Sequence, residues 1–175
     1  MRTFKNVKIN CIQGDIANQP DVSAIVNAAN AELKTGGGVA GAIHRAAGPQ
    51  LAEECQPMAP IKPGEAVISA AHNLPNNYVI HCLGPVYGQD KPEEKLLADC
   101  YRNALQIAEE HDIDSIAFPA ISTGAFGFPM KEAATVAFET IKDEIGQLKS
   151  VIEIRFVLFS DSDLRIHQKI LKTIA

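Results

Sequence analysis

The sequence predicts an α/β fold, specifically a three-layer α/β/α sandwich around a mixed, largely parallel central sheet. Short apolar runs rich in β-branched residues alternate with segments whose apolar residues recur at helical spacing. Several of the strand-like runs are too apolar for a sheet with one face in water, so helices should cover both faces. The chain has 175 residues, the length of one domain, and we expect residues 1–175 to form it.

The individual elements follow from these two patterns. The predicted strands are Val7–Ile12, Ala24–Ala28, Ala66–Ala70, Tyr78–Leu83, Ser115–Ala120 and Ile152–Phe159. The predicted helices are Val39–Ala47, Glu93–His111, Met130–Gln147 and Asp163–Ile174. In the second helix, Leu97, Cys100 and Ala104 recur at roughly helical spacing. Pro129 stands where a helix would start, and Asp161 where one could be capped.

Composition narrows the function classes. A net charge of -5 and an isoelectric point near 5.5 argue against a surface for nucleic acid or anionic membrane, which normally carries a basic patch. A small anionic ligand remains compatible, because backbone amides bind phosphate without any lysine. The start of the sequence lacks an apolar signal core, and no window approaches the length of a membrane span. A cytoplasmic location is therefore the default expectation.

Cysteines and histidines give no sign of a metal site. The four cysteines form no C-x-x-C pair and are expected to be buried free thiols; they are Cys11, Cys55, Cys82 and Cys100. The histidines are dispersed, and no H-E-x-x-H sequence occurs. We expect neither a metal nor a cofactor.

One glycine-rich segment matches a known phosphate-binding pattern by spacing. Gly36-x-Gly38-x-x-Gly41 satisfies the dinucleotide fingerprint G-x-G-x-x-G, but residues 30–35 separate it from the preceding strand. No acidic residue ends a second strand at the required distance, and Gly-Lys-Ser/Thr occurs nowhere. The glycines nevertheless precede a helix, so their N–H groups and the positive end of the helix dipole can face an anion.

A second glycine loop follows the fifth predicted strand. The sequence STGAFGFP leads into the helix after Pro129, and ligands of parallel sheets bind at the carboxyl ends of the strands. Two such loops at one edge suit a diphosphate, although either loop alone is equally well explained as a tight turn. Ser122 and Thr123 lack the G-x-S-x-G context of a serine hydrolase, and we interpret both as phosphate contacts.

Two asparagines lie at the end of the second predicted strand and just after it. An asparagine amide both donates and accepts hydrogen bonds, which suits sugar hydroxyls but also serves to fix a loop backbone. We assign the backbone role to Asn27 and the ligand to Asn30.

Six sequence blocks together resemble one known family. They are VNAAN, GGGVAGAIHRAAGPQL, GEAVIS, VIHCLGP, PAISTGAFGFP and VLFS, in an order similar to that of macrodomains of the MacroD type. The resemblance extends from Gly14 to Phe159. It implies a three-layer α/β/α fold that binds ADP-ribose. It also implies removal of ADP-ribose from modified acidic side chains, or deacetylation of O-acetyl-ADP-ribose.

The resemblance assigns roles to individual residues. It implies that Asp15 accepts from the adenine amino group, with Ile16 beside it and Phe159 packing near the adenine. It places Asn30 at the distal ribose, close to the scissile bond. The implied phosphate loops consist of Gly36, Gly37, Gly38 and Val39, and of Ser122, Thr123, Gly124, Ala125 and Phe126.

Two positions depart from the MacroD pattern. Ala40 replaces an aspartate thought to orient or activate the attacking water, and Phe126 replaces a tyrosine. The loop GGGVAGA is more similar to that of viral macrodomains, many of which hydrolyse mono-ADP-ribose esters. His44, one helical turn after Ala40, is a candidate base, although a packed or capping histidine is the commoner case.

Two hypotheses follow. In the first, the protein is a hydrolase of mono-ADP-ribose esters or a deacetylase of O-acetyl-ADP-ribose that acts through a positioned water. In the second, it is a module that reads ADP-ribose with little or no turnover. The expected partners are ADP-ribose, O-acetyl-ADP-ribose and mono-ADP-ribosylated proteins, with nucleic acid only as a modified substrate and no membrane. We expect a monomer.

Overall fold

The structure, a computed structural model, describes residues 1–174 and contains one seven-stranded sheet in that range. Its strands are β1 (Arg2–Phe4), β2 (Val7–Gln13), β3 (Ala24–Ala28), β4 (Ala66–Ala70), β5 (Tyr78–Cys82), β6 (Ser115–Phe118) and β7 (Glu153–Leu158). They lie in the order β1-β2-β7-β6-β3-β5-β4. The five inner strands are parallel, and the edge strands β1 and β4 are antiparallel to their neighbours. The expected mixed, largely parallel sheet is confirmed.

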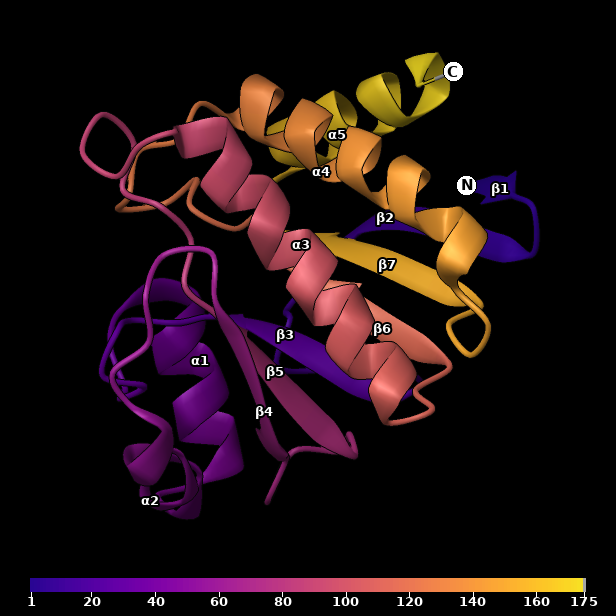
Figure 1. Ribbon diagram of the computed structural model, residues 1–175. Coiled ribbons are helices and arrows are strands. Elements are labelled where there is room, and N and C mark those ends of the chain that lie inside the picture. The colour runs from indigo at the N-terminus through magenta and orange to yellow at the C-terminus, as the bar shows by residue number, and fades with distance from the viewer. Residues whose placement is uncertain (175) are drawn as a thin grey trace.

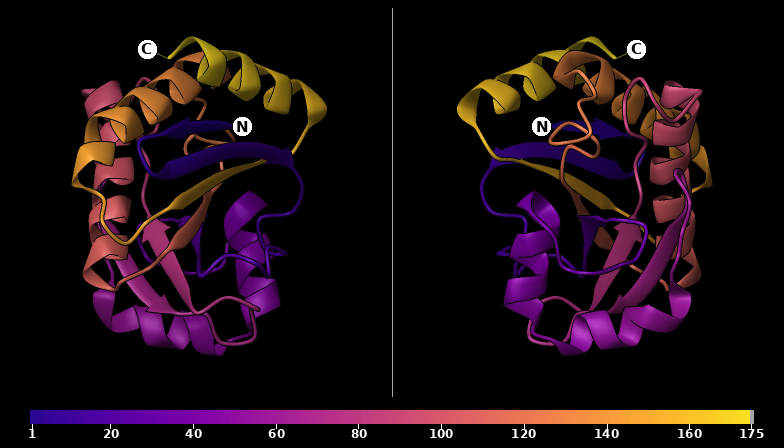
Figure 2. Two further views of the ribbon diagram at one scale, coloured as in Figure 1. Left: turned by 90° about the vertical axis from the view of Figure 1, so that its right-hand side faces the viewer. Right: turned by 90° about the vertical axis from the view of Figure 1, so that its left-hand side faces the viewer.

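Helices cover both faces of this sheet (Figures 1 and 2). They are α1 (Gly38–Ala47), α2 (Gln50–Cys55), α3 (Glu93–Glu110), α4 (Met130–Glu144) and α5 (Asp161–Thr173). Helices α3, α4 and α5 pack on one face, and their apolar residues form a single buried cluster with that face. Helices α1 and α2 pack on the other face around a second cluster. This is the predicted three-layer α/β/α sandwich.

The alternation of side chains along the strands produces the two clusters. Along β3, Val26 points into the first cluster and Ile25 into the second, and both are fully buried. The first cluster contains the stacked rings of Phe118 and Phe156, whose centroids are 5.6 Å apart. A strand buried on both faces explains why the sequence of β3 is apolar without alternation.

The structure corrects several predicted boundaries. Strand β1 and helix α2 had not been predicted, because each is too short to show a periodic pattern. Helix α4 ends at Glu144 and continues as a 3₁₀ turn, Ile145–Gln147. Helix α5 begins at Asp161, and its cap is Ser160, whose hydroxyl accepts from the Asp163 amide at 3.1 Å. The prediction of Asp161 as the cap was therefore wrong.

The four cysteines are buried and free, as expected. Within residues 1–174, no helix is long and apolar enough to cross a membrane.

Candidate functional site

The predicted ligand residues lie where the parallel strands reach their carboxyl ends. This side of the sheet, called the edge below, is distinct from the edge strands β1 and β4. Strands β2, β7, β6 and β3 are neighbours, and their parallel carboxyl ends reach that edge together. The loop after β2 carries Asp15, and Phe159 follows β7 directly. The second glycine loop follows β6, and the first lies between β3 and α1. The topology thus brings together residues that are far apart in the sequence.

The first glycine loop forms an uncapped helix start. Gly37 precedes α1, no side chain caps the helix, and its first turn contains no acidic residue. The first amides of a helix have no acceptor within the helix and carry its positive potential. A Cβ on Gly37 or Gly38 would meet no atom within 4 Å, and Gly38 has a φ of +54° that favours glycine. Free N–H groups and open space together suit an anion.

Asn30 lies directly beside this loop. Its Nδ2 donates to the Lys34 carbonyl at 2.8 Å, and its Oδ1 accepts from the Lys34 amide at 3.0 Å. A Cβ on Gly36 would lie 3.4 Å from Asn30 Nδ2, so the amide stands next to the glycines. Asn30 therefore fixes the loop backbone, and each end of its amide retains capacity for one further hydrogen bond.

The second glycine loop presents backbone rather than side-chain donors. The Thr123 hydroxyl donates to the Ala120 carbonyl at 2.7 Å, and the Thr123 amide donates to the same carbonyl at 3.3 Å. Ser122 has a φ of +68°. Its buried hydroxyl has no hydrogen-bond partner in the described part of the chain and packs against Gly84. Among residues 1–174, no acceptor pairs with the amides of Gly124, Ala125 and Phe126. The loop offers these three N–H groups to a ligand.

Two aromatic residues flank the edge. Phe126 is half-buried against the second cluster, and its carbonyl accepts from the Tyr87 amide at 2.8 Å. Phe159 is 92% exposed, although it follows a strand with a buried end. A fully exposed aromatic ring at this edge provides a surface on which a flat heterocycle can stack.

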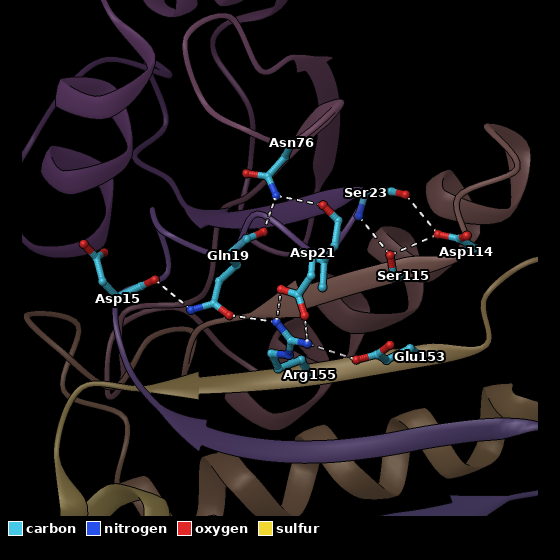
Figure 3. Close-up of polar contacts among 10 residues, drawn as sticks. Asp15, Gln19, Asp21, Ser23, Asn76, Asp114, Ser115, Glu153 and Arg155 are labelled. Atoms are coloured by element: carbon cyan, nitrogen blue, oxygen red, sulfur yellow. Dashed lines mark hydrogen bonds and ion pairs between the residues drawn. The ribbon is translucent and has the colours of Figure 1, made fainter.

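The loop after β2 presents one carboxylate. Asp15 is exposed, and its Oδ1 accepts from the Ala17 amide at 2.9 Å. Ile16 is buried in the second cluster, so its side chain packs inward rather than toward the edge. Figure 3 shows the Asp15 carboxylate directed away from the side chains of Gln19 and Arg155. Asp15 is thus both a turn residue and an accessible acceptor.

A row of buried polar side chains lies beneath α1. Asn27 and His81 face each other across β3 and β5, and Asn27 Nδ2 lies 3.0 Å from His81 Nδ1. His81 Nε2 lies 2.9 Å from Ser69 Oγ, which donates to the Ala70 carbonyl. Burial lowers the pKa of His81 to about 3, so the ring is neutral at physiological pH. Asn27 therefore holds a core histidine, and the prediction that it fixes loop backbone was wrong.

His44 lies on the inner side of α1, near this row. It is buried, its Nε2 has no hydrogen-bond partner within residues 1–174, and burial lowers the pKa of its ring. Ala40, on the same side of the helix, is also buried. In its neutral form the His44 ring has one unprotonated nitrogen.

The rest of the surface contains weaker candidates for a ligand site. Within residues 1–174, no group of three or more His, Cys, Asp or Glu side chains is arranged to bind a metal ion. A hollow of about 340 Å³ lies at the amino ends of β3, β6 and β7, and one of about 700 Å³ lies between α3 and α4. Neither contains any of the predicted ligand residues, and acidic side chains line both. The carboxyl ends of the strands remain the best candidate site because two loops with unpaired N–H groups lie there.

Comparison with known proteins identifies similar chains. The sequence model of the Macro domain matches residues 26–137. A macro domain-containing protein of Chlorobaculum tepidum is 47% identical over 167 residues, covering 95% of this chain and 96% of the relative. An O-acetyl-ADP-ribose deacetylase of Cronobacter sakazakii is 46% identical over 170 residues, covering 94% and 93%.

Solved structures of macrodomains are also similar to this chain. The macrodomain of Oceanobacillus iheyensis with ADP has a TM-score of 0.93 at 40% identity, covering 98% of this chain and 93% of that chain. A mutant of that macrodomain with ADPR has a TM-score of 0.92 at 39% identity, covering 98% and 95%.

Proposed function

Because the chain belongs to the macrodomain family, we propose that it binds ADP-ribose at the carboxyl edge of its sheet. The observation that carries the proposal is the pair of glycine loops with unpaired N–H groups, one of them an uncapped helix start. Such groups bind phosphate without a lysine. The similar macrodomain solved with ADP, and its mutant solved with ADPR, support this ligand.

The bound ligand would extend along the edge in a fixed direction. The diphosphate lies between the two glycine loops, where amides of both can donate to it. The adenine lies at the other strands, with its amino group toward Asp15 and its ring near Phe159. The distal ribose lies at Asn30, whose amide retains capacity for a hydroxyl.

We further propose that the protein hydrolyses esters of this ribose. The substrates are mono-ADP-ribose esters on acidic side chains, O-acetyl-ADP-ribose, or both. The deacetylase of Cronobacter sakazakii, which is 46% identical, supports this reaction class. Asn30 and a ligand phosphate position the attacking water, and the loop amides stabilise the negative charge that develops. The ligand phosphate is one candidate to receive the proton of the attacking water, and neutral His44 is a second.

One observation favours an alternative function. Ala40 occupies the place of the expected loop aspartate, and the two glycine loops contain no other carboxylate. Loss of a general base can lower a rate by roughly 10²–10⁴-fold. The alternative is therefore a module that binds mono-ADP-ribosylated proteins and releases the sugar slowly or not at all. A monomer in the cytoplasm suits either function.

A single-turnover experiment distinguishes the two functions. A glutamate-modified protein is mixed with excess chain, and release of ADP-ribose is followed for the natural sequence and for Ala40→Asp. The hydrolase proposal predicts measurable release by the natural chain, with faster release by Ala40→Asp. Zero release by the natural chain, with binding intact, would leave the alternative.

A further inference from the structure

Gln19 is a buried polar side chain in the loop that carries Asp15. Only 5% of its surface is exposed, and both ends of its amide are paired. Its Nε2 donates to the Asp15 carbonyl at 2.9 Å, and its Oε1 accepts from Arg155 Nη1 at 2.9 Å. Figure 3 shows Gln19 between the Asp15 backbone and the guanidinium of Arg155 on β7. Gln19 thereby connects the Asp15 backbone to the sheet.

Arg155 determines which way the Gln19 amide points. A guanidinium has only donors, so the amide oxygen of Gln19 must face it. The Nε2 then faces the other way, toward the Asp15 carbonyl, and can only donate there. The orientation of this amide follows from the chemistry of its partner.

Arg155 is itself held in place. Its two terminal nitrogens donate to the two carboxylate oxygens of Asp21 at 2.8 and 2.7 Å, and one of them also donates to Glu153 at 3.1 Å. The arginine side chain is only 11% exposed, whereas that of Asp21 is 66% exposed. Hydrogen bonding to Arg155 lowers the pKa of Asp21 to about 2, so the pair stays ionised at neutral pH. A bidentate pair of this kind holds the guanidinium and the carboxylate in a defined relative orientation.

The same loop is anchored on its other side. Asn76 Nδ2 donates to the carbonyls of Gln19 and Val22 at 2.7 and 2.8 Å. Among residues 1–174, the Asp15 carboxylate has no hydrogen-bond partner beyond the Ala17 amide. Its position depends on the Asp15 backbone. The Asp15 carbonyl accepts from the Asn18 amide at 2.9 Å and from the Gln19 amide, and of these two bonds the one to Gln19 connects the carbonyl to Arg155 on the sheet.

We propose that Gln19, oriented by Arg155, is the positioning residue that sets the adenine selectivity of the site by fixing the Asp15 backbone. The proposal rests on the proposed function, in which Asp15 accepts from the adenine amino group. Gln19 itself does not touch the ligand. Its effect should be confined to the base, because the glycine loops lie on other strands.

The variant Gln19→Glu tests this selectively. It keeps an oxygen toward Arg155 but places a second oxygen against the Asp15 carbonyl, which removes the donor and adds repulsion. The matched control is Ser23→Ala, which removes a 2.9 Å hydrogen bond to Asp114 from the same loop without contact to Asp15. Calorimetry gives the dissociation constants of ADP-ribose and of its deaminated analogue, which carries hypoxanthine. Hypoxanthine replaces the donating amino group by an acceptor.

The expected result is a change in preference. The natural chain and Ser23→Ala should prefer ADP-ribose over the deaminated analogue by at least about tenfold, the worth of one charge-assisted hydrogen bond. Gln19→Glu should reduce that preference to within about threefold. The dissociation constant of the deaminated analogue should change little. An unchanged preference, or an equal loss for both ligands, would overturn the proposal.

A second variant keeps the proposal testable if Gln19→Glu does not fold. Gln19→Met removes both hydrogen bonds without burying a charge, and it should show the same loss of preference. A natural chain that binds neither ligand would overturn the proposed function itself. A natural chain that binds ADP-ribose, with Gln19→Met as selective as the natural sequence, would overturn only the role of Gln19.

Discussion

Replacing Gly41 by alanine should displace the first glycine loop while leaving α1 folded. A Cβ on Gly41 would lie 2.4 Å from the Gly36 carbonyl oxygen, a backbone atom, and 3.0 Å from Arg45 Nη1. The arginine can rotate away, but the carbonyl cannot. Carbon and oxygen atoms that are not bonded lie about 3.3 Å apart or more, so the loop must retreat by about 1 Å.

The effects on stability and on binding should differ in size. Alanine is the better helix former by about 1 kcal/mol, which offsets part of the strain in the loop. An N–H donor displaced by about 1 Å no longer forms a normal hydrogen bond with a phosphate oxygen. Loss of two bonds to a charged group, at about 1.5 kcal/mol each, weakens binding by about 3 kcal/mol. That corresponds to roughly 10²-fold in the dissociation constant of ADP-ribose.

Calorimetry with ADP-ribose and urea unfolding measure the two effects separately. The matched control is Ala46→Gly, at an exposed position of the same helix. It should lose up to about 1 kcal/mol of stability and bind ADP-ribose normally. If Gly41→Ala binds ADP-ribose as tightly as the natural chain, the assignment of the first loop to the diphosphate is refuted.

Three further changes test other parts of the account. Asp15→Ala should weaken ADP-ribose binding by roughly 1–3 kcal/mol in calorimetry, and no change would leave Asp15 as a turn residue only. Phe159→Ala should weaken binding by roughly 1–3 kcal/mol through lost stacking, with an unchanged melting temperature because the ring is 92% exposed. Acid should destabilise the fold, because His81 has a pKa of about 3 when folded and 6.5 when unfolded. The unfolded chain binds the extra proton, so the free energy of unfolding should fall below about pH 6.5 by up to about 1.4 kcal/mol per pH unit. Urea unfolding between pH 7 and 5 should show this slope, and a slope that His81→Gln leaves unchanged would contradict it.

The sequence allowed most of the fold to be predicted because hydrophobic periodicity survives in long elements. Helix α3 carries a helical pattern over its whole length, and strand β3 was recognisable as a continuous apolar run. Strand β1 contains only Arg2–Phe4 and is half-exposed, and α2 contains only Gln50–Cys55. Elements of this length are stabilised by their neighbours rather than by their own pattern, so the sequence alone did not reveal them.

The loops of the site could be located from the sequence, but their internal bonding could not. Glycines and an asparagine after apolar strands indicated the edge, since parallel strands end together. The use of the Thr123 hydroxyl within its own loop depends on the turn geometry. The bond between Gln19 and Arg155 joins residues 136 positions apart, and no local signal predicts it. Asn27 and His81 did leave a trace, since each is the polar residue of an otherwise apolar run.

The central claim is that the edge binds ADP-ribose as a whole, with its diphosphate between the two glycine loops and its distal ribose at Asn30. Calorimetric titration of the natural chain with ADP-ribose, ADP and AMP tests this most directly. The account predicts that ADP-ribose binds much more tightly than either ADP or AMP, because only ADP-ribose reaches both the loops and Asn30. Equal affinities for the three ligands would contradict it.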